Sequence, residues 1–271
     1  MGNRLEGKVA IVTGAGSDGE GIGNGKAAAV LFAREGARVG LVDNVPARAE
    51  ETLGMIQDDG GEAFVIGADL SSAKDCERMV QSVVERYDGL DILHNNVGIS
   101  RRGTVLEVDE ETWDLVMSVN LKSVMLASRF AIPVMKKNDG GVIINVASTA
   151  GLRAHSANSS TAYTASKGGI IALTHSMAAD HGRDGIRVNC IAPGLVETPM
   201  FEAVASEEGR TIRRSATPLG TPGTGWDVGW AAVYLASDEA RWVTGVVLPV
   251  DGGLTVTTPA TYMRWRPGET S

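Results

Sequence analysis

The feature that most constrains the fold of this chain is an alternation of short apolar runs with longer amphipathic stretches, almost from end to end. The apolar runs, rich in β-branched residues, cover residues 8–13, 38–43, 62–67, 90–94, 141–146, 186–191 and 245–250. The stretches that we expect to be helices cover residues 25–35, 46–58, 72–87, 110–137, 162–182 and 227–237. Because the apolar runs show no strict alternation of polar and apolar residues, they are typical of strands covered on both faces. The order predicts an α/β protein with a doubly wound, Rossmann-type sheet of about seven mostly parallel strands and helices on both faces.

We expect one domain, 1–271, since no linker, repeat or low-complexity run divides the chain. Residues 195–225 depart from the pattern, with three prolines, several glycines and little helical signal. A long irregular insertion in a compact α/β domain is usually functional, so we expect a functional loop rather than a disordered one. The tail 257–271 carries Tyr262, Met263 and Trp265, large side chains that predict docking, with a neighbouring subunit as a candidate surface.

Charge and cysteine content exclude several classes of protein. The 25 Lys and Arg against 33 Asp and Glu leave a net charge of −8, which disfavours nucleic acid and anionic membranes as partners. Cys76 and Cys190 form no CxxC or metal-type spacing, and the four histidines form no metal set, so no metal is expected. The N-terminus lacks the apolar segment of a secretory signal, and no apolar run approaches the roughly 20 residues of a membrane span. These observations predict a soluble, cytoplasmic protein.

The first apolar run ends in a glycine-rich turn, Thr13–Gly25, that opens directly into the first expected helix. Glycines let the backbone turn tightly and let a pyrophosphate approach the free N–H groups at the positive end of the helix. The candidate cofactor-binding residues in the turn are Gly14, Ser17, Ile22 and Gly23. Asp43, at the end of the second run, can accept hydrogen bonds from both hydroxyls of an adenosine ribose and would repel a 2′-phosphate. These features predict NAD(H) rather than NADP(H), in preference to a capping or turn role for Asp43.

Tyr163 and Lys167 stand four residues apart at the start of an expected helix, so they share one helical face. The lysine ammonium can stabilise a tyrosinate and lower the pKa of the tyrosine from about 10 toward working pH. A tyrosinate within hydrogen-bond reach of a substrate hydroxyl is a general base for alcohol oxidation. In reverse, the tyrosine is the general acid for carbonyl reduction.

At this point the sequence resembles the classical short-chain dehydrogenase/reductase family over nearly the whole chain. Besides Tyr163 and Lys167, the matching pieces are Thr13–Gly14, Ala68–Leu70, Asn95–Gly98, Asn120, Ser148, Pro193–Thr198 and Asp251–Gly253. A Tyr-x-x-x-Lys pair alone occurs by chance in many helices. The complete set, in this order and on these elements, is specific.

The resemblance implies a role for each matched residue. Tyr163 would be the acid/base, Ser148 would hydrogen-bond the reacting oxygen, and Lys167 would bind the nicotinamide ribose as well as tune Tyr163. Asn120 would hold a water in a proton relay, and residues 195–225 would form a substrate lid that orders on binding. Beyond Tyr163 and Lys167, the further cofactor contacts it implies are Asp69, Leu70, Asn96, Gly98, Pro193, Gly194, Val196 and Thr198.

The glycine turn is longer than the family pattern Thr-Gly-x-x-x-Gly-x-Gly. An ungapped count back from residues 33–37 puts the last family glycine on Gly25 and its partner on Gly23, with five extra residues. The local string Gly21–Gly23 requires only three extra residues. Both alignments remain open from the sequence, so the phosphate-binding atoms are not assigned.

Two further departures concern the site. Ser148 and Tyr163 are two residues further apart than is common in the family, and the extra length falls within 153–160. That segment should form one wall of the substrate pocket, where His155 is a possible substrate contact but more simply an exposed loop residue. Val97 stands where the family usually has Ala, beside the cofactor, and requires local repacking.

The residues together predict an NAD(H)-dependent oxidoreductase that interconverts a secondary alcohol and a ketone by hydride transfer, without a metal or a covalent intermediate. The alternatives are a 3-oxoacyl thioester reductase acting on carrier-protein or CoA substrates, and a non-catalytic nucleotide-binding scaffold. Asp43 weakens the first, because biosynthetic reduction usually draws on NADPH, and an intact acid/base set weakens the second. Helices around 113–135 and 162–177 pair across a dimer interface in the family, which implies a homo-oligomer, a tetramer ahead of a dimer. Substrate identity and direction stay open.

Overall fold

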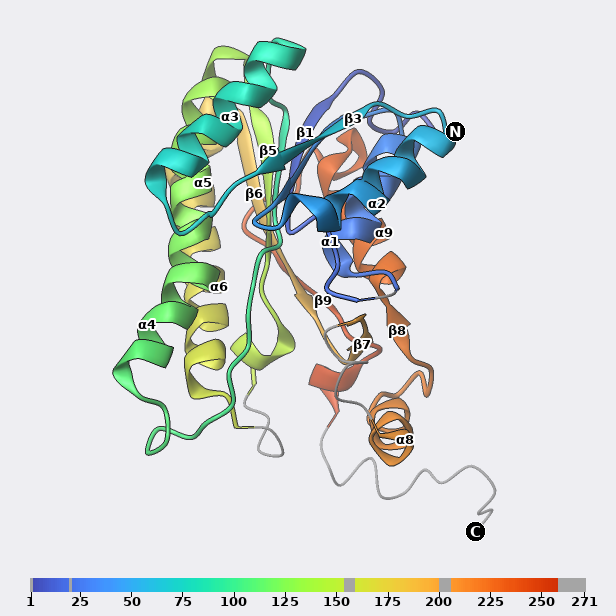
Figure 1. Cartoon of the computed structure of the whole chain (residues 1–271), viewed down its shortest axis with the longest axis vertical. Helices are drawn as coiled ribbons and strands as arrows, with labels where there is room; N and C mark the ends of the chain where they lie inside the picture. The colour runs from blue at the N-terminus through green and yellow to red at the C-terminus, as the bar shows by residue number, and fades with distance from the viewer. Residues whose placement is uncertain (1, 20, 154–158, 200–205, 258–271) are drawn as a thin grey trace.

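The computed structural model describes residues 2–19, 21–153, 159–199 and 206–257, and Figure 1 shows one sheet between two layers of helices. The sheet has seven strands, all parallel, in the order β3-β2-β1-β4-β5-β6-β9. The strands are β1 Val9–Thr13, β2 Arg38–Asp43, β3 Ala63–Gly67, β4 Ile92–Asn95, β5 Gly141–Val146, β6 Ile186–Pro193 and β9 Val247–Val250. The main helices are α1 Asn24–Arg34, α2 Pro46–Asp58, α3 Ala73–Tyr87, α4 Glu110–Met117, α5 Ser123–Lys137, α6 Thr161–His181 and α9 Gly225–Ala236. The predicted fold class is confirmed, and each expected strand and helix is present with its ends shifted by at most two residues.

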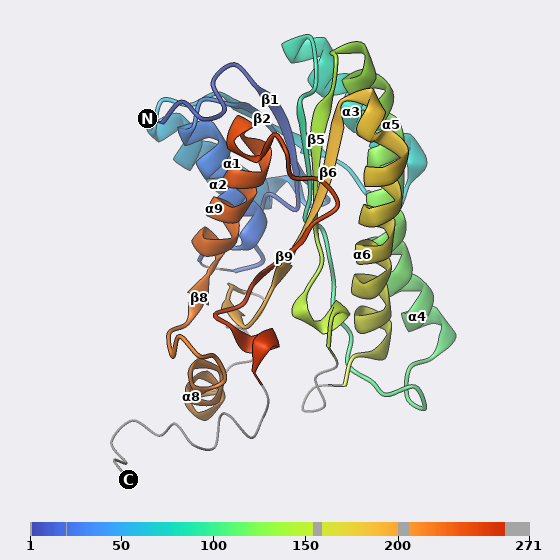
Figure 2. The same cartoon turned by 180° about the vertical axis from the view of Figure 1, so that it is seen from behind.

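Each face of the sheet has its own apolar core. Helices α1, α2 and α9 cover one face, where Phe32, Ile56 and Val233 are fully buried. Helices α3, α5 and α6 cover the other face, around Met79, Ala131 and Ile170, as the reverse view in Figure 2 also shows. Burial on both faces explains why the strands appear in the sequence as continuous apolar runs.

One long helix crosses the second face. α4, the π-helical turn η1 (Ser118–Lys122) and α5 continue without a break over Glu110–Lys137. By length and composition this segment passes as a membrane span within the described residues, so the expectation that no run approaches that length was too strict. Its side chains Leu126, Ala127 and Met135 are buried in the core beside α3 and α6, which is the packing of a core helix.

The topology decides where a ligand can bind. β1 pairs with β2 on one side and with β4 on the other, so the order of strands reverses between β1 and β4. In doubly wound sheets, ligands occupy the crevice outside the carboxyl ends of the strands at such a reversal. The segments after β1, β4, β5 and β6 all leave the sheet at this edge, which points downward in Figure 1.

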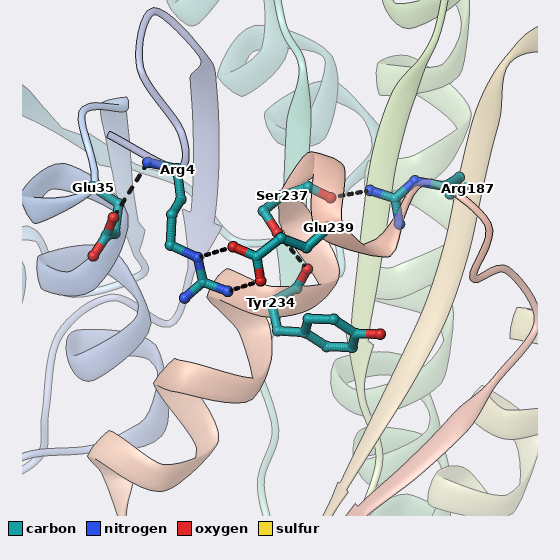
Figure 3. Close-up of polar contacts among 6 residues, drawn as sticks. All are labelled: Arg4, Glu35, Arg187, Tyr234, Ser237 and Glu239. Atoms are coloured by element: carbon teal, nitrogen blue, oxygen red, sulfur yellow. Dashed lines mark hydrogen bonds and ion pairs between the residues drawn. The ribbon is translucent and has the colours of Figure 1, made fainter. Parts of the chain in front are cut away.

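The opposite end of the molecule is held by a polar cluster shown in Figure 3. The Arg4 guanidinium makes two hydrogen bonds of 2.7 Å to the Glu239 carboxylate, just beyond α9. Arg187, at the start of β6, donates to the carbonyls of Leu235 and Ser237 at 2.8 and 3.2 Å. These contacts tie the N-terminus and β6 to the last turn of α9, whose other end packs against the glycine turn.

Both described parts of the segment 195–225 contain regular secondary structure, although the sequence shows only a weak helical signal there. β7 (Val196–Glu197) pairs in parallel with β8 (Gly223–Thr224), which ties the two ends of the segment together. Between them lies α8 (Glu207–Ser215), so the expectation of little helical structure was wrong. α8 has a Ser206 cap, acidic residues in its first turn and arginines in its last, but almost no apolar residues. Apolar periodicity therefore misses it, while capping and the helix dipole favour it.

Candidate active site

The glycine turn brings the end of β1 and the start of α1 into direct backbone contact. Gly14 has a φ of +63°, and a Cβ on Gly25 would lie 2.1 Å from the Gly14 carbonyl oxygen. Only glycine fits at the latter position, so the first turn of α1 can approach the strand and present its free N–H groups at the switch point. The Ser17 hydroxyl accepts a hydrogen bond from the Gly23 N–H at 3.3 Å and closes the turn.

This packing identifies the alignment that the sequence left open. Gly23 is the N-cap of α1, and Gly25 is the close-approach glycine, in agreement with the ungapped count. Asn24 and Gly25 are therefore the first helical residues, and the sequence candidates did not include them, although the ungapped count would have indicated both. Ile22, which was a candidate, precedes the cap, and its carbonyl faces Gly225 at the start of α9.

The lengthened part of the turn is fastened to its neighbours. Lys26, whose side chain is fully buried, donates to the Gly21 carbonyl at 3.2 Å and pairs with Glu51 of α2 at 2.7 Å. Pro199, at the start of the 195–225 segment, lies next to Gly21. Gly21 thus contacts both Lys26 at the start of α1 and Pro199 in the segment expected to be the lid.

Asp43 lies at the carboxyl end of β2, where its expected ribose role requires it. It is buried, and its carboxylate accepts hydrogen bonds from the Gly16 and Val45 N–H groups at 3.2 and 2.9 Å. It therefore holds the glycine turn as well as facing the corner between β1 and β2. Asp69 and Leu70 follow β3, with the Asp69 carboxylate accepting from the Ser71 N–H and hydroxyl and Leu70 buried in the core.

The end of β4 is joined to the glycine turn by side chains. The Thr13 hydroxyl accepts from the Asn96 N–H at 2.9 Å, and the Asn96 amide donates to the Gly14 carbonyl at 3.2 Å. Gly98 lies against the catalytic candidates, since a Cβ there would be 3.2 Å from Lys167 Nζ. Val97 faces the space left by the missing side chain of Gly14, 3.4 Å from the position of its Cβ, which accommodates the larger residue.

Ser148 and Tyr163 are brought together by a short helix after β5. Ser148 caps the 3₁₀ turn η2 (Thr149–Gly151), where its hydroxyl accepts from the Ala150 N–H at 3.1 Å. Gly151 has no room for a side chain against the backbone of Lys167, so η2 packs directly on α6. The hydroxyls of Ser148 and Tyr163 are hydrogen-bonded to each other.

The electrostatics of this pair differ from the sequence expectation. Burial raises the pKa of Tyr163 above its usual value, and the hydrogen bond from Ser148 lowers it only in part. The Lys167 ammonium lies 5.6 Å from the centre of the Tyr163 ring and donates to the Val146 carbonyl at 2.8 Å. Burial in turn lowers the pKa of Lys167 to about 8. The pKa of Tyr163 is therefore raised in the chain alone rather than lowered as expected, because desolvation outweighs the hydrogen bond from Ser148.

Asn120 lies in the π-helical turn η1 and is fully buried. Its side chain accepts from the Ile99 N–H at 2.8 Å and donates to the Ile99 carbonyl and the Ser166 hydroxyl at 2.9 and 3.0 Å. Both amide hydrogens are thus used within the fold, so a relay water would have to bind elsewhere on this residue. A π-turn widens the helix and leaves backbone groups without their usual partners, which is common at functional sites.

The remaining cofactor candidates follow β6. Gly194 donates to the Val250 carbonyl at 2.9 Å and lies so close to Asp251 that a Cβ would be 2.6 Å from its side chain. Pro193 ends β6, Val196 is buried in β7, and Thr198 is half-buried just beyond it. β1, β4, β5 and β6 are neighbours in the sheet and end at the same side of it (Figure 2). Gly14, Asn96 and Ser148 follow the first three of these strands, Pro193 ends the fourth, and Lys167 lies in α6.

The described histidines and Cys190 lie outside the cluster formed by Ser148, Tyr163 and Lys167. His94 is buried in β4, His175 is exposed on α6, and His181 contacts Asp184 at 3.0 Å. Burial raises the pKa of the Cys190 thiol to about 11, in keeping with a core residue. No cluster of metal-ligating side chains occurs in the part of the chain that the structure describes. His155 in the pocket wall and the tail residues Tyr262, Met263 and Trp265 lie outside the described residues.

A glycine turn at the reversal of a doubly wound sheet, together with half-buried Ser148 and Tyr163 beside buried Lys167 and Asn120, defines a Rossmann-type oxidoreductase. The comparisons with known proteins agree. A family model described as Enoyl-(Acyl carrier protein) reductase matches residues 17–255. The 3-oxoacyl-[acyl-carrier-protein] reductase of Thermotoga maritima is 38% identical over 257 residues, 93% of this chain and 100% of that protein.

Further relatives and solved structures extend the agreement. The 2-(S)-hydroxypropyl-CoM dehydrogenase 3 of Xanthobacter autotrophicus is 38% identical over 260 residues, 94% of this chain and 99% of that protein. A short-chain dehydrogenase/reductase structure from Burkholderia xenovorans has a TM-score of 0.90 at 39% identity, covering 94% of this chain and 99% of its own. The structure of levodione reductase matches with a TM-score of 0.88 at 30% identity, and the match covers 93% of this chain and 99% of that one. The chain belongs to the classical short-chain dehydrogenase/reductase family, whose members typically use a nicotinamide cofactor.

Proposed function

We propose that this protein is an NAD(H)-dependent dehydrogenase that interconverts a secondary alcohol and a ketone. The observation that carries the proposal is the Tyr163 hydroxyl, hydrogen-bonded to Ser148 and standing on the same helical face as Lys167. A scaffold that only binds nucleotide has no use for an acid/base pair of this kind.

The glycine turn and Asp43 fit a dinucleotide. A side chain at Gly25 would be excluded by the Gly14 carbonyl, so glycine there lets the first turn of α1 pack on the end of β1. The free N–H groups of that turn would then face a pyrophosphate. Asn24 Oδ1, at the first position of α1, is buried and has no partner among the described residues, as expected of a group that meets a ligand. Asp43 would accept the hydroxyls of the adenosine ribose. Asn96 and Gly98 would lie by the same sugar, and Lys167 would bind the nicotinamide ribose.

The side chains then divide the chemistry. A nicotinamide held beside Lys167 and the residues after β6 would supply the hydride chemistry, taking a hydride from the carbinol carbon or giving one to the carbonyl carbon. Tyr163 takes the hydroxyl proton of the alcohol during oxidation and returns a proton to the carbonyl oxygen during reduction. Ser148 donates a hydrogen bond to the same oxygen and stabilises the charge that develops on it. Lys167, protonated below a pKa of about 8, supplies the positive charge that favours the tyrosinate once Tyr163 loses its proton.

A 3-oxoacyl thioester reductase is the second candidate, and the similarity to the Thermotoga maritima reductase favours it. Acetoacetyl-CoA discriminates the two functions. Reduction of this thioester with NADH or NADPH, at a kcat/KM above that of simple ketones, would favour the second candidate.

The test of the proposal is a fluorescence titration with NADH and with NADPH, followed by an absorbance screen of secondary alcohols with NAD. We expect tighter binding of NADH and turnover of one class of alcohol. Tyr163→Phe should lower kcat/KM by about 10²–10⁴-fold while the NADH Kd changes little. Tyr234→Phe, at the far end of α9 (Figure 3), is the matched control and should keep full activity. Near-normal activity of Tyr163→Phe would overturn the assignment.

A further inference from the structure

The lengthened glycine turn places a carboxylate that the proposed mechanism does not use. Asp18 Oδ1 lies 2.9 Å from a terminal nitrogen of the Arg48 guanidinium. The Asp18 side chain is 83% exposed and that of Arg48 is 38% exposed, so the pair lies at the surface of the site and can be reached by a ligand. Asp18 lies between Gly14 and Gly23, in the part of the turn that is longer than the family pattern.

Arg48 emerges at the corner where a ribose would bind. It stands in the first turn of α2, which begins three residues after Asp43. A Cβ on Gly16 would lie 2.6 Å from Arg48 Cβ and 2.8 Å from Asp43 Oδ2. The Arg48 stem and the Asp43 carboxylate therefore flank the same point of the glycine turn.

The chemistry of this corner depends on both carboxylates. A 2′-phosphate would bring about two negative charges toward Asp43, and a nearby arginine is the group that usually accommodates them. Arg48 is such an arginine, but its guanidinium is already paired with Asp18. Lys26, a second cation close to the turn, is paired with Glu51.

We propose that Asp18 is a specificity-determining residue: its ion pair with Arg48 withholds that arginine from a 2′-phosphate and so strengthens the preference for NAD(H). The proposal rests on the proposed binding of a nicotinamide dinucleotide at this turn. Asp43 favours NAD(H) by its position at the ribose, and Asp18 determines whether the Arg48 guanidinium is free to bind a 2′-phosphate. Removal of Asp18 deletes one negative charge and releases one positive charge at the same corner.

The test uses probes that need no substrate. Isothermal titration of the full-length protein with adenosine 5′-monophosphate and with adenosine 2′,5′-bisphosphate gives a ratio of two Kd values. Asp18→Asn should lower the Kd of the bisphosphate by about three- to tenfold and leave that of the monophosphate unchanged. The same variant should raise the ratio of kcat/KM for NADPH to that for NADH.

Two further variants separate the effect from a general change of charge. Asp59→Asn breaks a similar surface pair, between Arg34 and Asp59 at 2.8 Å, and should leave the ratio at its wild-type value. Asp18→Asn/Arg48→Gln should lose the gain of Asp18→Asn, because Arg48 supplies the attraction. A gain that survives in the double variant would overturn the role of Arg48.

An unchanged ratio in Asp18→Asn, or an equal change in Asp59→Asn, would overturn the inference while the proposed function stands. If the wild-type protein binds neither adenosine nucleotide nor NADH, the proposed cofactor site fails and the inference fails with it. The two failures are therefore distinguishable in one set of titrations.

Discussion

At the scale of single residues, the site holds a cation that the fold would be more stable without. Lys167 is buried, and its pKa falls from 10.5 to about 8 because burial disfavours the charged form. Below pH 8 the folded and unfolded states both carry the proton, and the folded state bears the full cost of burying it. As pH rises from 8 toward 10.5, only the unfolded state keeps the proton, so that cost fades and stability rises.

Lys167→Met should therefore be more stable than the wild type at pH 7, by about 1 to 3 kcal/mol, although it should abolish turnover. The gain could be as small as about 1 kcal/mol because the Val146 carbonyl loses its hydrogen-bond donor in this variant. Urea denaturation of the protein without cofactor at pH 7 and at pH 9.5 measures the difference, which should shrink at the higher pH. A variant less stable than the wild type at pH 7 would contradict this account.

His94 is a second buried group whose protonation makes the stability of the fold depend on pH. It lies in β4 with neither ring nitrogen hydrogen-bonded within the described residues, in edge contact with the Phe32 ring, and burial lowers its pKa from 6.5 to about 4. As pH falls from 6.5 to 4, the unfolded state takes up a proton that the folded state does not, so stability is lost by up to about 3 kcal/mol. Unfolding midpoints in urea at pH 7.5 and pH 5 should show this loss in the wild type and a smaller one in His94→Leu. His175→Leu, at an exposed position, is the control and should keep the wild-type pH dependence.

At the scale of elements, the prediction succeeded where a strand is one continuous apolar run or a helix has a clear apolar periodicity. β2, β5 and α2 have the expected bounds. The π-turn within 110–137 was not foreseen, because the hydrogen bonds of Asn120 to Ile99 and Ser166 reach across to other segments and leave no local pattern. α8 was missed because its stabilisation comes from its cap and charges rather than from apolar periodicity.

Two helical glycines provide a matched test of the glycine-turn geometry. Gly25→Ala places a methyl group 2.1 Å from the Gly14 carbonyl oxygen, so it should displace α1, abolish NADH binding and lower the unfolding midpoint. Gly54→Ala, in α2 with open space around it, should instead stabilise the protein by about 0.5–1 kcal/mol and leave NADH binding unchanged. Fluorescence titration and thermal unfolding measure both effects. Tight NADH binding by Gly25→Ala would mean that the close approach is not required.

At the scale of the whole molecule, assembly remains a prediction. Trp113, Leu115 and Met125 on α4 and α5 are between 37% and 44% exposed, on helices expected to pair between subunits. We expect the protein to be a homo-oligomer, a tetramer ahead of a dimer. Met125→Glu should shift the mass measured by light scattering toward a smaller species, because it buries a charge in the interface. Gln57→Glu adds the same charge to the exposed surface of α2 and should leave the mass unchanged. A monomeric wild type would contradict the expectation.

The fold class and the chain positions of the catalytic candidates were predictable because they depend on local patterns. Apolar runs of strand length, helical periodicity and the four-residue spacing of Tyr163 and Lys167 are properties of neighbouring residues, and each is visible in one stretch of sequence. The reversal of strand order, which places the site, also follows from the βαβ alternation once the family pattern is recognised.

Other properties of the site depended on contacts between segments far apart in the chain. The alignment of the glycine turn follows from Gly25 meeting the Gly14 carbonyl, and the direction of the Tyr163 pKa shift follows from burial. The pairing of Asp18 with Arg48 joins a loop and a helix that the sequence does not relate. Desolvation, close approach and charge pairing depend on distances in space, and only the packed tertiary structure sets those distances.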